Sequence, residues 1–180
     1  KQAFLYLGET YRPNSGDKVF VFGFSRGAYS ARVLAGLVEI AGIPDFQAID
    51  QLPISEERKT KKKEALVDDV FSAYRGDKSK EKRKQLVENL SAYAGNESEI
   101  EFMGLWDTVP AIGLPDYKED VQKTPNRYYD QLCNVKKAAH AMSIDDNRSR
   151  VFVALTLTSE SLIADCPDKD IGSIVEEVWF

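Results

Sequence analysis

A serine flanked by two glycines stands near the start of the chain, in the pattern G-x-S-x-G formed by Gly23, Ser25 and Gly27. This pattern is typical of a nucleophilic serine on a sharp strand-to-helix turn, which lifts the hydroxyl above the end of a sheet. We expect glycine at both positions because side chains there would collide with the neighbouring strand and with the first turn of the helix. Ser25 is therefore the candidate nucleophile, and the backbone amide of Arg26 is a candidate donor to the oxyanion formed on a carbonyl substrate.

The residues on both sides of Ser25 have the element order that such a turn requires. Residues 18–23 form a short apolar run of β type, and apolar residues recur at helical spacing through residues 26–41. Gly42 follows as the expected C-cap of that helix. A strand before and a helix after Ser25 favour catalysis over the alternative, in which Ser25 only caps a helix.

A second candidate, Asp107, stands where another predicted strand, residues 99–106, runs into a loop. A carboxylate at the carboxyl end of a strand can orient a histidine base and stabilise its cationic form. Asp107 also follows Ser25 along the chain, which is one of the known orders for a serine, acid and histidine triad. The alternative is an aspartate that caps the loop after the strand.

His140 is the only histidine in the sequence and comes third in that order, so it is the candidate base. However, residues 134–146 have the pattern of a helix, whereas the base of such a triad normally lies on a loop after a late strand. Helical packing, or a hydrogen bond that supports the site from behind, is the competing interpretation of His140.

The wider pattern predicts an α/β fold with strands at residues 18–23, 99–106, 150–157 and 174–180. These are few strands, and the chain opens inside a predicted helix and stops within an apolar strand. We therefore expect residues 1–180 to be one incomplete domain, a fragment of a larger one. Its residues 43–98 read as a helical insertion, which is either a lid that gates an apolar substrate or a set of outer helices packed on the sheet.

Composition and charge limit the partners. The formal net charge of −5 gives no electrostatic case for nucleic acid. Basic runs at residues 58–63 and 78–84 are either solvated helix faces or a rim for anionic lipid. No signal peptide or long apolar span is visible, so a membrane contact would be peripheral. The wide spacing of Cys133 and Cys166 suggests neither a metal site nor a disulfide framework, and a reducing compartment is compatible with it.

Three segments resemble one protein family. They are FGFSRGAYSAR at residues 22–32, GLWDTV at residues 104–109 and HAMSIDDNR at residues 140–148. Together they are similar to an uncharacterised α/β-hydrolase family that includes catalytic domains of type VI secretion phospholipase effectors. The resemblance implies a mostly parallel sheet with flanking helices and a helical insertion after the nucleophile helix. It also implies that the catalytic histidine lies in a Pro-Gly-x-His segment absent from residues 1–180, so that His140 matches a position outside the triad.

The expected function is a serine hydrolase of carboxylic esters that works through an acyl-enzyme, without a metal or organic cofactor. The resemblance implies a phospholipid or other lipid ester as substrate. The location stays open between the cytoplasm and export as an effector, and the protein partners stay open as well. Two alternatives remain. One is a catalytically inactive relative that serves as a binding or sensor module, and the other is a peptidase or thioesterase on the same scaffold.

Overall fold

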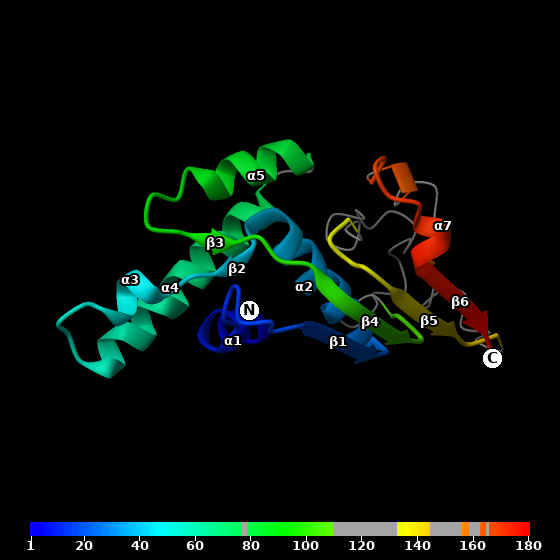
Figure 1. Cartoon of the computed structure of the whole chain (residues 1–180), viewed down its shortest axis with the longest axis horizontal. Helices are drawn as coiled ribbons and strands as arrows, with labels where there is room; N and C mark the ends of the chain where they lie inside the picture. Colours follow the sequence, from blue (N-terminus) through cyan, green and yellow to red (C-terminus); the bar gives the residue numbers. More distant parts are fainter. Residues whose placement is uncertain (77–78, 110–132, 145–155, 159–162, 165) are drawn as a thin grey trace, which may run out of the picture. The chain divides into compact units, whose positions relative to one another are not determined.

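The computed structural model describes residues 1–76, 79–109, 133–144, 156–158, 163–164 and 166–180 (Figure 1). The chain divides into two compact units, which we describe separately. The helical unit consists of Lys1–Asp17 and Leu37–Ser98, and the sheet unit consists of Lys18–Gly36 and Glu99–Phe180.

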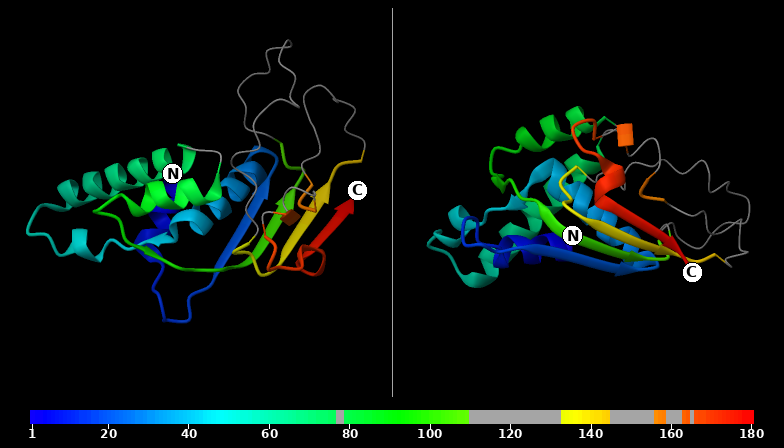
Figure 2. Two further views of the ribbon diagram at one scale, coloured as in Figure 1. Left: turned by 90° about the horizontal axis from the view of Figure 1, so that it is seen from above. Right: turned by 45° about the vertical axis from the view of Figure 1, so that its right-hand side comes forward.

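Four parallel strands in the order β1-β4-β5-β6 form the core of the sheet unit. Figure 1 shows them side by side with their arrowheads pointing the same way, and both views of Figure 2 keep this order. The strands are β1 (Val19–Phe24), β4 (Ile100–Trp106), β5 (Ala138–Met142) and β6 (Val175–Trp179). Because the strands are parallel, their carboxyl ends lie at one edge of the sheet and their amino ends at the other. We call these the C-terminal edge and the N-terminal edge.

The side chains of β1 and β5 alternate between a buried and a more open face, as a pleated strand requires. Val19 and Val21 of β1 are buried, whereas Phe20 and Phe22 are exposed on the opposite face. In β5 the same alternation places His140 in the buried row. The core of the sheet unit therefore contains one ionisable ring among apolar side chains.

Helix α2 (Arg26–Ala41) follows β1 and runs from the sheet unit into the helical unit. It ends where predicted, at Gly42, which has a φ of 72°. The amide of Gly42 donates to the carbonyl of Val38 over 2.8 Å. A residue with a side chain would be strained at this angle, so glycine terminates the helix as the expected C-cap.

The helices of the helical unit form from amphipathic segments of the sequence. In α4 (Glu56–Arg75), buried residues recur at helical spacing at Leu66, Val67, Val70 and Tyr74. Its basic run pairs with acidic residues at the surface, for example Lys61 with Glu57 over 2.7 Å, which supports the interpretation of a solvated face. The elements of the unit besides the end of α2 are α1 (Gln2–Thr10), β2 (Ile43–Pro44), α3 (Gln47–Asp50), α4 (Glu56–Arg75), α5 (Lys80–Glu88) and β3 (Gly95–Asn96).

Most of residues 43–98 are helical, as predicted for an insertion. The lid interpretation of this segment and the single incomplete domain stay predictions. None of the described helices is long and apolar enough to span a membrane.

One predicted helix and one predicted strand differ from the structure. Residues 134–146 were expected to be helical, but Ala138–Met142 form β5. Alanine favours helices, yet β5 lies between β4 and β6 and pairs with both, so tertiary pairing decides its conformation. The strand expected at residues 150–157 lies mostly outside the described residues, and the described residues 156–157 are not in a strand. The strands expected at 18–23, 99–106 and 174–180 are confirmed as β1, β4 and β6.

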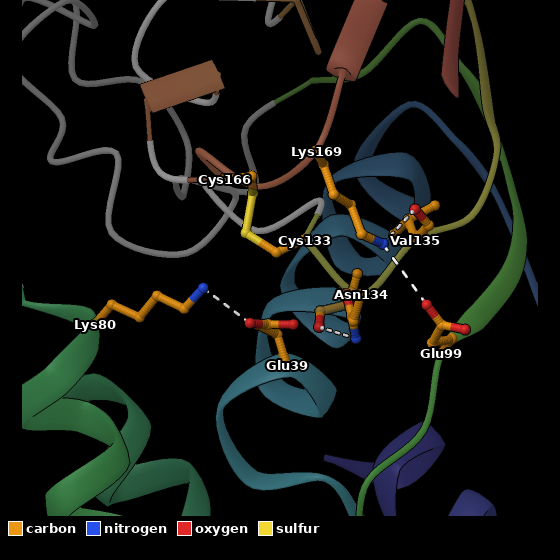
Figure 3. The surroundings of a disulfide bond; sticks show 9 residues. Glu39, Lys80, Glu99, Cys133, Asn134, Val135, Cys166 and Lys169 are labelled. Carbon is orange, nitrogen blue, oxygen red and sulfur yellow. Dashed lines mark hydrogen bonds and ion pairs between the residues drawn. A yellow bond between two sulfur atoms is a disulfide. The ribbon is translucent and has the colours of Figure 1, made fainter. Parts of the chain in front are cut away.

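The expectation that the cysteines do not pair was wrong. Cys133 and Cys166 form a disulfide with their Cα atoms 5.3 Å apart (Figure 3). Cys133 precedes β5, and Cys166 precedes α7 (Ile171–Ile174) and β6. Because β5 and β6 are neighbours in the sheet, the segments that lead into them meet at the N-terminal edge, although the cysteines are 33 residues apart.

Candidate active site

Ser25 lies in the tight turn that connects β1 to α2, at the C-terminal edge of the sheet. Its φ of 54° falls in the left-handed region, which is unfavourable for a residue with a side chain. Backbone hydrogen bonds hold this conformation. The Ser25 amide donates to the carbonyl of Trp106 over 2.8 Å, and the Ser25 carbonyl accepts from the amides of Ala28 and Tyr29. The serine thus sits on a strained and firmly held strand-to-helix turn.

The two glycines that flank Ser25 have different surroundings. A Cβ atom built on Gly23 would lie 2.5 Å from the Cα atom of Ala28 and 2.5 Å from the carbonyl oxygen of Gly27. No described atom outside the local helix backbone lies within 4 Å of a Cβ atom built on Gly27. The steric expectation is therefore confirmed at Gly23, where β1 and α2 touch through their backbones, and not at Gly27.

Asp107 directly follows β4 and also has a left-handed conformation, with a φ of 46°. Its amide donates to the carbonyl of Ala141 over 2.7 Å, and the amide of Val109 returns to the carbonyl of Ser25 over 3.3 Å. Since Phe24 and Trp106 are register partners in the sheet, Ser25 and Asp107 follow paired residues on adjacent strands. The structure thus brings the backbones of these two candidates together at the C-terminal edge.

The side chain of Asp107 does not act as a loop cap in the described part of the chain. A capping aspartate accepts a hydrogen bond from a nearby backbone amide, and no such bond is seen for Asp107 among the described residues. The Asp107 side chain is half-buried.

Arg26 is the first residue of α2. Amides in the first turn of a helix have no acceptor within the helix, and the helix dipole places partial positive charge there. The Arg26 amide therefore has the position of a donor to an anion that forms next to Ser25.

His140 lies in the core, with its side chain 0% exposed. Its Nε2 atom is 2.9 Å from the hydroxyl of Thr108, and its Nδ1 atom is 3.1 Å from a carboxylate oxygen of Glu177 on β6. Both ring nitrogens are thus engaged, and neither contacts Ser25 or Asp107. These contacts favour the interpretation of His140 as a group that supports the site through hydrogen bonds from within the core, and not as the base.

Glu177 is held in its ionised form. Burial raises the pKa of this carboxyl, but hydrogen bonds from His140, from the Thr158 hydroxyl and from the Leu157 amide outweigh burial. Together they lower the pKa of Glu177 from 4.5 to about 2. The carboxylate is therefore an acceptor at neutral pH, and His140 donates to it from Nδ1.

Sequence reasoning missed Thr108 and Glu177. The one signal for Glu177 was a pair of acidic residues in the middle of the apolar run at residues 174–180, since a charge in a buried strand needs a partner. Nothing in the sequence singled out Thr108. Among the described residues, no three histidine, cysteine, aspartate or glutamate side chains are grouped as metal ligands would be.

A family model described as "T6SS, Phospholipase effector Tle1-like, catalytic domain" matches residues 1–180. The chain belongs to this family. The resemblance predicted from three short motifs is thereby confirmed over the whole chain, and the α/β fold with a parallel sheet flanked by helices agrees with the fold class expected. The family description names a phospholipase effector.

The chain is also 28% identical over 149 residues to "Uncharacterized protein YEL023C" of Saccharomyces cerevisiae. This match covers 82% of the chain and 20% of the yeast protein, so the chain spans about a fifth of the length of that relative. No solved structure matches the chain.

Proposed function

We propose that this chain carries the nucleophile and the acid of a serine hydrolase that cleaves carboxylic esters of lipids, with phospholipids as the favoured substrate class. The observation that carries the proposal is the pairing at the C-terminal edge. Ser25 and Asp107 follow register partners on adjacent strands, and both have left-handed backbones. Non-glycine residues are rarely strained in this way except where function over-determines the conformation. Membership in a phospholipase effector family supports the same activity.

In the proposed mechanism, the hydroxyl oxygen of Ser25 attacks the ester carbonyl while a histidine base accepts its proton. The turn at Ser25 then acts as a nucleophile elbow, and the Arg26 amide donates to the oxyanion of the tetrahedral intermediate. The intermediate collapses to an acyl-enzyme as the alcohol leaves with the proton from the base. Water, activated by the same base, attacks the acyl-enzyme, and the fatty acid and the free serine are formed.

Asp107 orients the base in this mechanism and stabilises its cationic form. We do not assign the base to His140, because its ring is buried and both nitrogens are engaged with Thr108 and Glu177. The family resemblance assigns the base to a Pro-Gly-x-His motif that does not occur in residues 1–180.

The test uses the intact protein, a fluorophosphonate probe that labels active serines, and vesicles of mixed phospholipids. We expect wild-type protein to be labelled and to release fatty acid, and Ser25→Ala to lose both. Asp107→Asn should lower the rate of release roughly 10³- to 10⁴-fold, as loss of the orienting acid does in serine hydrolases. Ser72→Ala is the matched control, because this exposed serine of α4 only bonds the carbonyl of Asp68.

Two results would count against the proposal. Labelling that persists in Ser25→Ala would mean that the nucleophile is another residue. A folded wild-type protein with neither labelling nor release would instead support the alternative of an inactive binding or sensor module that retains the turn as architecture.

A further inference from the structure

A buried row of polar side chains lies beneath the C-terminal edge and consists of Thr108, His140 and Glu177. The side chain of His140 is fully buried, Thr108 is 6% exposed, and the side chain of Glu177 is 10% exposed. Burying polar groups costs free energy unless each of them is hydrogen-bonded. Apolar residues would fill a parallel sheet at lower cost, so this row needs an explanation beyond packing.

Each side chain of the row is hydrogen-bonded, and the donors and acceptors follow one order along the row. The carboxylate of Glu177 only accepts, so it fixes the proton of His140 on Nδ1. In the neutral ring, Nε2 then accepts from the hydroxyl of Thr108 over 2.9 Å. At its other end, Glu177 also accepts from the amides of Leu157 and Thr158 and from the hydroxyl of Thr158. A shift of any member would break bonds along the row.

Thr108 connects this row to the candidate active site. It stands between Asp107, whose amide bonds the carbonyl of Ala141, and Val109, whose amide bonds the carbonyl of Ser25. The backbone at Asp107 is left-handed and therefore needs its neighbours to hold it. The Thr108 side chain adds an anchor from the buried side, between these two backbone hydrogen bonds.

We propose that His140 and Glu177 are positioning residues that hold the turn at Asp107 in register with Ser25. His140 bonds the hydroxyl of Thr108, and Glu177 fixes the ring of His140 through Nδ1. The effect of this role on catalysis rests on the proposed hydrolase function. Its effect on the structure, the support of the turn at Asp107, does not. A misplacement of about 1 Å in a catalytic group costs up to about 100-fold in rate. The buried pair thus acts on the reaction without touching the substrate.

The decisive variants change the Thr108 hydroxyl with little change in shape. Thr108→Val removes the hydroxyl, and Thr108→Ser keeps the hydroxyl and removes the methyl group. We expect Thr108→Val to lower kcat for ester hydrolysis roughly 10- to 100-fold with little change in KM, and Thr108→Ser to retain most of kcat. Thr60→Val on α4, where the hydroxyl bonds a helix carbonyl, is the control for the substitution itself.

Glu177→Gln tests the far end of the row, and its double variant with Thr108→Val tests the coupling. If the two residues act through one chain of bonds, the double variant should have the kcat of the more damaged single variant rather than the product of both losses. Multiplied losses, or a Thr108→Ser variant as slow as Thr108→Val, would overturn the positioning role.

Amide hydrogen exchange of the intact protein separates this proposal from the hydrolase proposal. Thr108→Val and Glu177→Gln should both speed exchange in the peptide that holds Asp107 and Val109, and leave the peptides of α4 unchanged. This result in a protein that hydrolyses no ester would reject the proposed function and keep the positioning role. Unchanged exchange at Asp107 and Val109 would overturn the positioning role, whatever the activity.

Discussion

The two edges of the parallel sheet are held together by different means. At the C-terminal edge, Ser25 and Asp107 have strained backbones that are held by backbone hydrogen bonds to neighbouring segments. At the N-terminal edge, a disulfide joins Cys133 to Cys166, and the ammonium group of Lys169 donates to the carbonyl of Val135 over 3.3 Å (Figure 3). Strain is thus concentrated at one edge and covalent reinforcement at the other.

This difference would separate the proposed reaction from stability within one sheet. Strained conformations cost free energy and persist where the surrounding structure over-determines them. A cross-link at the opposite edge stabilises the strands without restricting the groups proposed to react. Changes at the N-terminal edge should therefore affect mainly stability, and changes at the C-terminal edge mainly activity.

The largest effect on stability is expected from the disulfide. Replacing both cysteines in Cys133→Ser/Cys166→Ser removes a cross-link between residues 33 apart in sequence. Chain entropy for a loop of this length predicts a loss of about 4 kcal/mol. Amide exchange in β5 and β6 should report this loss as faster opening, while the rate of fluorophosphonate labelling at Ser25 should stay within about twofold of wild type.

Reductant supplies the control for the disulfide variant. It should bring exchange in the wild-type protein to the level of the double variant and leave the double variant unchanged. Equal exchange in the two proteins without reductant would show that the cross-link does not stabilise this edge. A large loss of labelling in the variant would show that the two edges are not separable.

The buried carboxylate between the edges should make stability depend on pH. The pKa of Glu177 is about 2 in the folded chain against 4.5 ordinarily, so its ionised form is favoured by folding. The stabilisation is present above pH 4.5 and is lost as pH falls towards 2. For a shift of this size it amounts to about 3 kcal/mol. Glu177→Gln should remove this part of the pH dependence of unfolding.

Glu176→Gln is the matched control for that titration, since Glu176 is the exposed neighbour on the same strand. It should keep the wild-type profile between pH 5 and 2. If Glu177→Gln also kept the wild-type pH dependence of unfolding, the contacts with His140 and Thr158 would not be what stabilises the ionised carboxylate.

Local signals predicted part of this fold. The strands β1, β4 and β6 are runs of branched and aromatic residues that can be recognised alone, and the turn at Ser25 has its own pattern. β5 was missed because Ala138 to Ala141 favour a helix by composition and become a strand only between two partners. Its conformation depends on residues far away along the chain.

The support of the candidate site was missed for the same reason. Thr108 is 32 residues from His140, and His140 is 37 residues from Glu177. Contacts at such separations leave no periodicity in a single sequence. Ser25 and Asp107 were found because each stands at the end of a recognisable strand, whereas the groups beneath them become neighbours only once the sheet has formed.

The smallest expected effect compares the two glycines beside Ser25. In Gly23→Ala the new methyl group would overlap the backbone of α2 at Ala28. Relief of this overlap should cost roughly 1–3 kcal/mol of stability and slow the labelling of Ser25, because the turn must open.

Gly27→Ala places the same methyl group where no described atom outside the local helix backbone lies within 4 Å. It should label at the wild-type rate and gain up to about 1 kcal/mol from the helix propensity of alanine. Equal losses in the two variants would mean that both glycines serve the turn, and that its strain is not located where β1 and α2 touch.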